Sequence, residues 1–170
     1  MTVGNLPFRF LKVFMLPEIL LEKIISGGQT GADAAGLDWA IRNQVVHGGW
    51  CPKGRKSESG RIDQKYLLTE TSTANYLQRT EMNVAESDAT IIFTLADKLT
   101  GGSLKTQEFA TKHGKPVFHF RPGVHPKFIR SFLISNNVRC LNIAGSREST
   151  APGVSAIVMG ALDTACLHAQ

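Results

Sequence analysis

Glycine and hydroxyl residues gather at two places where their types and spacing could bind an anion. The first is Ser26-Gly27-Gly28-Gln29-Thr30-Gly31, and the second is Thr100-Gly101-Gly102-Ser103, with Thr106 shortly after it. Each follows an apolar run and precedes a helical pattern. Glycines bring backbone N–H groups close to an anion, and a helix N-terminus adds partial positive charge. The pattern predicts two halves of one phosphate or oxyanion cradle, with ordinary tight turns as the alternative.

The first stretch matches neither of the common phosphate-binding fingerprints. It lacks the G-x-G-x-x-G spacing of dinucleotide enzymes and the Gly-Lys-Ser/Thr of a Walker loop. Thr30 and Asp33 fit the capping pattern [ST]-x-x-[DE]. We therefore expect Asp33 to cap the following helix rather than to act as a catalytic acid.

Five further residues could contact such a ligand, each with a structural alternative. Trp50 could stack on a ring and Lys53 could reach a phosphate, unless "GGWCPKGRK" (48–56) is only a solvated basic loop. Arg147 could present its planar fork to an oxyanion or carboxylate, or form a surface salt bridge with Glu148. Arg79 and Asn83 share a helical face.

The helical spacing of Arg79 and Asn83 is four residues, so both could point to one cleft. An Arg entering the cleft would be a plausible anion contact, and an exposed helical charge is the alternative.

Apolar runs alternate with helical patterns, and the candidate residues follow the apolar runs. We predict strands at 23–28, 44–50, 89–95, 115–120 and 138–145, and helices at 32–43, 74–88, 101–114, 125–137 and 152–169. In the first helix the predicted apolar face contains Ala34, Leu37, Ala40 and Ile41. Strands separated by helices predict a single Rossmann-like, doubly wound α/β domain with a mainly parallel sheet of at least five strands. Ligands bind beyond the carboxyl ends of such strands, which is where the candidate loops lie.

The domain is expected to span residues 23–170, after an N-terminal extension of residues 1–22 in which Met15 could be an alternative start. Pro17, Glu18 and Glu22 interrupt the apolar N-terminal region, so no signal peptide is predicted. No run reaches the ~18 apolar residues of a membrane helix. We expect a cytoplasmic protein.

Composition narrows the classes of partner. The 170 residues are 42% hydrophobic and 19% charged, which is typical of a globular protein. The net charge of +5 is scattered, and Lys53, Arg55 and Lys56 form its only cluster. A small acidic ligand accounts for this excess without a nucleic-acid partner. Three cysteines without a C-x-x-C pattern suit a reducing compartment, and no close Cys/His pair predicts a metal site.

Five segments, taken in order, resemble the molybdenum carrier (molybdenum cofactor carrier protein) family from about residue 23 to 168. They are "IISGGQTGADAAGLDWAI", "GGWCPKGRK", "YLQRTEMNVAESDATIIF", "LTGGSLKT" and "LNIAGSRES". The resemblance implies a homodimer or homotetramer with a pocket for the phosphate-bearing molybdenum cofactor, a related nucleotide, or molybdate or tungstate. It implies a binding role for Gly27, Gly28, Gln29, Thr30, Gly31, Gly101, Gly102, Ser103 and Thr106. Molybdenum enzymes or cofactor-biosynthesis proteins are the implied protein partners.

The wider Rossmann-like superfamily includes the lysine-decarboxylase-like phosphoribohydrolases of the Lonely-guy type. Arg79 and Glu108 match their catalytic Arg and Glu, whereas Thr100, Leu104 and Lys105 depart from their P-G-G-x-G-T-x-x-E motif. Three functions therefore stay open. The leading one is a carrier that performs no covalent chemistry. The others are a hydrolase of nucleoside monophosphates and a sensor of nucleotide or ADP-ribose-type ligands.

Overall fold

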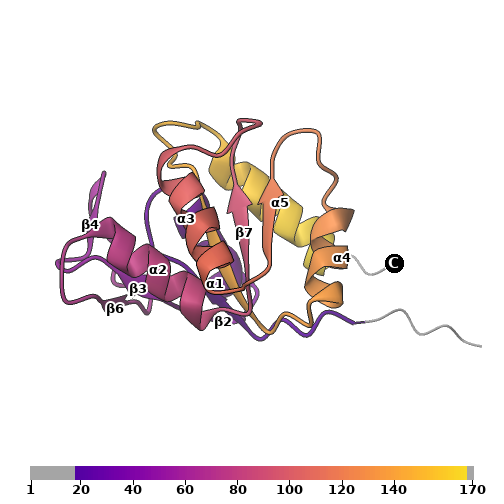
Figure 1. Ribbon diagram of the computed structural model, residues 1–170, viewed down its shortest axis with the longest axis horizontal. Helices are drawn as coiled ribbons and strands as arrows, with labels where there is room; N and C mark the ends of the chain where they lie inside the picture. The colour runs from indigo at the N-terminus through magenta and orange to yellow at the C-terminus, as the bar shows by residue number, and fades with distance from the viewer. Residues whose placement is uncertain (1–17, 168–170) are drawn as a thin grey trace, which may run out of the picture.

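A five-stranded parallel sheet lies at the centre of the molecule, with helices on both faces (Figure 1). The computed structural model describes residues 18–167. The strands of this sheet are β1 (Lys23–Ile25), β2 (Val46–Gly48), β7 (Ala89–Phe93), β8 (Val117–Phe120) and β9 (Cys140–Gly145). The helices of the described residues are α1 (Ala32–Arg42), α2 (Tyr76–Glu86), α3 (Gly101–Lys112), α4 (Lys127–Ser135) and α5 (Val154–Cys166). The prediction of one doubly wound α/β domain is confirmed.

The strand order is β2-β1-β9-β7-β8, and every neighbouring pair is parallel. Counted from β9, this order is 3-2-1-4-5, the order of a Rossmann sheet. The last strand of the described chain therefore occupies the position of the first strand. The topological switch point, where ligands bind in such sheets, lies between β9 and β7.

The helices form two layers. Helix α5 packs against α1 and α4 on one face of the sheet, and α2 packs against α3 on the other (Figure 1). Strand β7 is buried along its whole length, because both of its faces are covered. Its Ile91 and Phe93 join Leu141 and Ile143 of β9 in the main hydrophobic core.

Helix α1 is buried on more than one side, which corrects its predicted apolar face. Leu37 and Ala40 are buried as expected, but Ile41 is 40% exposed. Trp39 is buried in the main core instead, and its indole N–H donates to Asp163 at 2.8 Å. Leu37 belongs to a second apolar cluster, with Cys51, Ile62 and Tyr66. Because α1 packs against the main core on one side and this second cluster on another, it has no single apolar stripe.

The long polar segment between β2 and α2, residues 49–75, forms a lobe that short strands order. Strands β3 (Trp50–Cys51) and β6 (Thr69–Glu70) pair in parallel, and β4 (Lys56–Ser57) and β5 (Gly60–Arg61) form a hairpin. Arg55 is 5% exposed. Its guanidinium donates to the carbonyl groups of Ile62, Asp63, Tyr66 and Leu68. Arg55 therefore organises the lobe and does not contribute to a basic surface.

The first described residues already contact the core of the domain. Ile19 and Leu21, which the sequence analysis placed in the extension, pack against the main core, and the N–H of Glu22 donates to the carbonyl of Arg139. The alternative start at Met15 lies outside the described residues. At the other end, α5 starts at Val154 rather than at Pro152, because Gly153 adopts a left-handed conformation before it.

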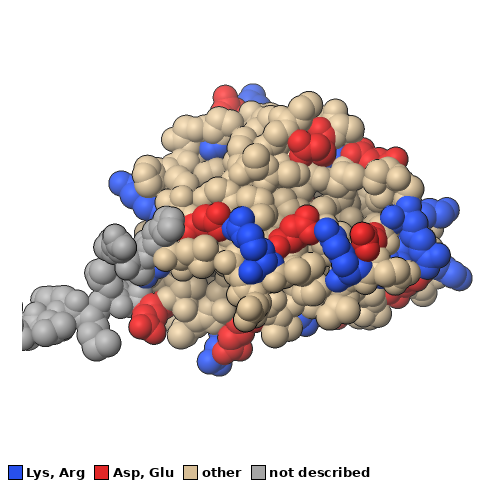
Figure 2. Space-filling model, turned by 180° about the vertical axis from the view of Figure 1, so that it is seen from behind, with Lys and Arg blue, Asp and Glu red and all other residues tan. Residues whose placement is uncertain are grey.

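Acidic and basic side chains alternate across the face opposite that of Figure 1 (Figure 2). Elsewhere on the surface of the described residues, ion pairs such as Lys112–Glu81 also bring opposite charges together. The face in Figure 2 therefore offers no continuous positive stripe of the kind that binds nucleic acid. Within residues 18–167, no helix is long and apolar enough to cross a membrane.

Candidate functional site

A cleft of about 420 Å³ opens at the carboxyl ends of β1, β7 and β9. Four segments contribute most of its lining: the loops after these three strands and the first turns of α2. The lining residues that bear on its chemistry are Gln29, Asp33, Tyr76, Arg79, Lys98, Gly101, Gly102, Ser103, Thr106, Ser146 and Arg147. The cleft therefore coincides with the switch point between β9 and β7.

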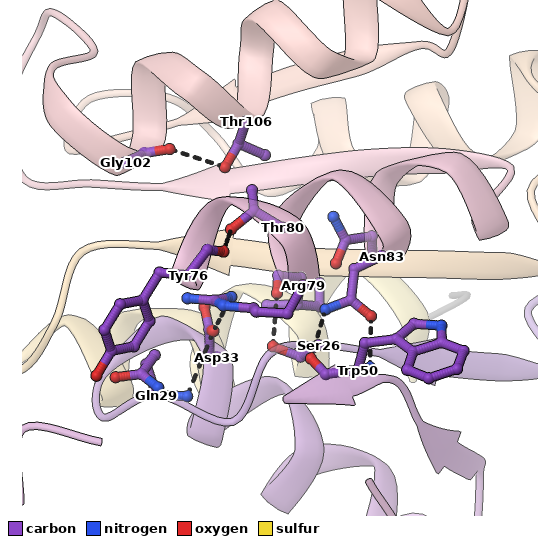
Figure 3. Close-up of polar contacts among 12 residues, drawn as sticks. Ser26, Gln29, Asp33, Trp50, Tyr76, Arg79, Thr80, Asn83, Gly102 and Thr106 are labelled. Carbon is purple, nitrogen blue, oxygen red and sulfur yellow. Dashed lines mark hydrogen bonds and ion pairs between the residues drawn. The ribbon is translucent and has the colours of Figure 1, made fainter. Parts of the chain in front are cut away.

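The N-terminus of α3 is open toward this cleft. Thr100 makes no side-chain capping bond, and a Cβ at Gly101 or Gly102 would meet no atom within 4 Å. The first N–H groups of a helix have no intrahelical acceptor, so these groups are available to an anion. The hydroxyl of Thr106 is already used, because it donates to the carbonyl of Gly102 at 2.9 Å (Figure 3).

Helices α1 and α5, which follow β1 and β9, already have partners at their N-termini. The N–H of Ala32, at the start of α1, donates to the carbonyl of Ser146 at 3.0 Å. At α5 the carboxylate of Glu148 accepts from the N–H groups of Gly153 and Ser155 and from the Ser155 hydroxyl. The bonds from the Ser155 hydroxyl and these N–H groups hold the pKa of Glu148 below its usual value. Glu148 is therefore a helix cap and not the salt-bridge partner of Arg147.

The glycines of the first loop serve close packing within the protein. A Cβ at Gly27 would lie 1.8 Å from the Arg79 guanidinium, and one at Gly28 would lie 2.5 Å from the Leu68 side chain. Gly31, with a φ of 80°, turns against the backbone of residues 146–148. None of these glycines, nor Thr30, is among the lining residues. In this part of the chain, Gln29 of the loop and Asp33 of α1 line the cleft.

The predicted capping box does not form. The residue before α1 is Gly31, without a side-chain capping bond, and the Thr30 hydroxyl donates to Glu58 instead. Asp33 does not complete the pattern either, because its Oδ2 accepts, weakly and at 3.4 Å, from the N–H of Gln29 and not from that of Thr30.

Asp33 and Arg79 form a buried ion pair in the wall of the cleft. Arg79 Nη1 lies 3.1 Å from Asp33 Oδ2, and the two side chains are 13% and 5% exposed (Figure 3). Burial raises the pKa of the Asp33 carboxyl; the Arg79 charge, the Gln29 N–H and the Arg147 charge oppose this rise. Tyr76 lies beside both cations, with its ring centre 5.9 Å from Arg79 and 5.5 Å from Arg147.

Glu58, at the tip of the β4–β5 hairpin, joins two loops of the site. It accepts hydrogen bonds from the hydroxyls of Thr30 and Ser149, and Arg147 lies 3.8 Å away. The Ser149 and Thr30 hydroxyls lower the pKa of the Glu58 carboxyl. No local pattern predicts this contact, since Ser149 lies 91 positions away. Helical spacing could have indicated Tyr76, because it lies three residues before Arg79 on α2 and therefore on the same face.

Besides Thr30 and the glycines of the first loop, four predicted residues lie outside the cleft lining: Trp50, Lys53, Asn83 and Glu108. Asn83 instead bonds the backbone of Trp50 at both ends of its amide, accepting at 2.8 Å and donating at 3.0 Å (Figure 3). Glu108 pairs with Lys105 on an exposed part of α3. The structure thus places Arg79, but not Glu108, at the cleft. Among residues 18–167, no cluster of His, Cys, Asp or Glu is arranged to hold a metal ion.

The position of Asn83 makes a prediction about stability. Asn83→Ala removes both bonds to Trp50, and we expect it to lower the free energy of unfolding by about 2 kcal/mol. Asn83→Asp keeps the acceptor but loses the donor, so its loss should be intermediate. Urea denaturation of the three proteins measures this order. An Asn83→Ala variant with wild-type stability and weaker anion binding would instead support the ligand contact expected from sequence.

Comparison with known proteins gives relatives over most of the chain. A family model described as "Circularly permutated YpsA SLOG family" matches residues 24–166. A solved structure, named "Putative molybdenum carrier protein" and from Syntrophus aciditrophicus SB, is 40% identical, with a TM-score of 0.83. That match covers 87% of this chain and 96% of the other. No curated protein matches. The position of β9 in the sheet agrees with a circular permutation.

Proposed function

The chain belongs to the circularly permutated YpsA SLOG family, and from this premise we propose that it is a molybdenum carrier. Its cleft would hold the molybdenum cofactor by its phosphate, or molybdate or tungstate as the free oxyanion. The observation that carries this proposal is the open N-terminus of α3, with no side-chain cap, in a cleft that also contains Lys98 and Arg147. The name of the 40% identical relative supports the same role.

The donors of the cleft suit an oxyanion. Backbone N–H groups at Gly101–Ser103 would bind two or more of its oxygens, and Arg147 would add a planar pair of donors. Charge-assisted hydrogen bonds of this kind contribute about 1.5–3 kcal/mol each when they are shielded from water. Arg79 contributes less, since Asp33 already holds its guanidinium. No step of covalent chemistry is needed.

The hydrolase alternative gains no support, because Glu108, its second catalytic group, pairs with Lys105 outside the cleft. A sensor of ADP-ribose-type ligands would use the same loops as a carrier and would differ in its ligand. A carrier must also pass its ligand on, so a molybdenum enzyme or a cofactor-biosynthesis protein is the proposed partner.

Calorimetric titration tests the proposal. We expect heat of binding with molybdate, with tungstate or with isolated molybdenum cofactor. If none of molybdate, tungstate and the cofactor binds at millimolar concentration, the carrier role is refuted. Binding of ADP-ribose alone would favour the sensor.

Arg147 provides the matching variant. Because its side chain lines the cleft and is half-exposed, Arg147→Ala should weaken tungstate binding about tenfold without unfolding the protein. Arg61→Ala, on the exposed strand β5 outside the cleft, is the control for loss of one positive charge. Equal weakening in the two variants would mean that net charge, and not this site, attracts the anion.

A further inference from the structure

One acceptor atom beside the cleft has no donor among the described residues. Gln29 lines the cleft and is 3% exposed, and its buried Oε1 makes no hydrogen bond within residues 18–167. Its Nε2 donates to the carbonyl of Lys56 at 2.8 Å. A carbonyl can only accept, so the amide cannot be flipped and Oε1 must be the free end. Buried acceptors of this kind are seldom left unpaired.

The lining of the cleft contains both donors and acceptors. The Asp33 carboxylate is already used, because it accepts from Arg79 and from the N–H of Gln29. The start of α3, Lys98 and Arg147 supply donors. Molybdate and tungstate carry only acceptors at neutral pH, so they can bond these donors but not Gln29 Oε1. The group that Gln29 lacks must carry an N–H or O–H.

We propose that Gln29 is a specificity-determining residue: its Oε1 accepts a hydrogen bond from an N–H or O–H of the ligand. This inference rests on the proposed function, because it assumes that the anionic part of the ligand binds at α3. It assigns the ligand to the organic phosphates that carry hydroxyl or amino donors, and it ranks free oxyanions as partial ligands. A site built to bond a donor group discriminates strongly against analogues that lack it.

The test compares Gln29→Met with the wild-type protein. Methionine is unbranched like glutamine but has no amide, so it removes the acceptor with little change of shape. The probes are inorganic phosphate, propyl phosphate, ribose 5-phosphate and GMP, of which the last two carry donors beyond the phosphate. In the wild-type protein we expect ribose 5-phosphate or GMP to bind at least about tenfold more tightly than inorganic phosphate. In Gln29→Met that gain should disappear, with phosphate affinity unchanged.

Two results would overturn the role of Gln29 while leaving the anion site intact. One is an equal gain for the donor-bearing probes in Gln29→Met. The other is a propyl phosphate gain in the wild-type protein as large as theirs, which decides the question even if the variant does not fold. Failure of every probe, including tungstate, to bind the wild-type protein would overturn the proposed function and this inference with it.

Discussion

Replacing Arg79 by alanine is expected to lower the free energy of unfolding by about 3–5 kcal/mol at neutral pH. The variant leaves the Asp33 carboxylate in the wall of the cleft, 5% exposed and without the guanidinium 3.1 Å from it. A buried charge that loses its partner destabilises the folded state much more than an exposed pair would. The Gln29 N–H, at 3.4 Å, is too weak a donor to compensate.

The loss should depend on pH, and its sign follows from Asp33. Burial already raises the pKa of this carboxyl above 3.8, and removing the Arg79 charge removes the main effect that opposes the rise. A group with a raised folded-state pKa favours folding while it is protonated. Its contribution is complete below the unfolded-state pKa and is lost as the pH rises through the folded-state value. The Arg79→Ala protein should therefore become progressively less stable from about pH 4 upward.

Urea denaturation at several pH values measures both effects. Asp33→Asn in the Arg79→Ala background is the control, because an amide cannot ionise. The double variant should recover part of the lost stability and should lose the additional dependence on pH. If Arg79→Ala unfolds at the wild-type urea concentration at pH 7, the ion pair does not stabilise the fold as argued.

Gly31→Ala should produce the second large effect, a loss of about 2–5 kcal/mol in stability. The residue has a φ of 80°, and a Cβ there would lie 2.4 Å from the carbonyl oxygen of Ser146 and 2.6 Å from the N–H nitrogen of Glu148. Both neighbours are backbone atoms, so the loop after β9 must move as a unit. Arg147 would move with it, and tungstate binding should weaken in proportion.

Gly160→Ala is the matched control for this substitution. Gly160 lies inside α5, has an ordinary φ, and a Cβ there would meet nothing within 4 Å. Alanine is the better helix former, so this variant should be about 0.5–1 kcal/mol more stable than the wild type. Denaturant unfolding and tungstate titration of both variants check the pair. Wild-type values for Gly31→Ala in both experiments would contradict the packing described for this turn.

Much of the fold could be predicted because alternation of strands and helices is a local property of the sequence. The rule that ligands bind at strand ends led to the loops of Gln29, Gly101 and Arg147, all of which line the cleft. The order of the strands could not be predicted. Strand β9 lies between β1 and β7, and nothing in its own residues specifies those neighbours.

Several residues have other contacts than the sequence analysis predicted, and one physical reason accounts for them. Helical spacing indicates which residues share a face, but not what packs on that face. Arg79 and Asn83 do lie on one side of α2, yet the edge of β3 covers Asn83 and the cleft borders Arg79. On α1 the same lobe covers Leu37 but not Ile41, which is exposed. The lobe also explains Thr30, whose hydroxyl bonds Glu58 there rather than capping its own helix.

The central place of β9 has a consequence for synthesis. A ribosome releases β1, β2, β7 and β8 before β9, and until then the β1–β2 and β7–β8 pairs have no strand to join them. Each pair exposes an apolar edge during that interval, which is a hazard for aggregation. Arg147 follows β9, so the cleft is also completed last. A nascent chain stopped before residue 140 can neither close its sheet nor complete the cleft.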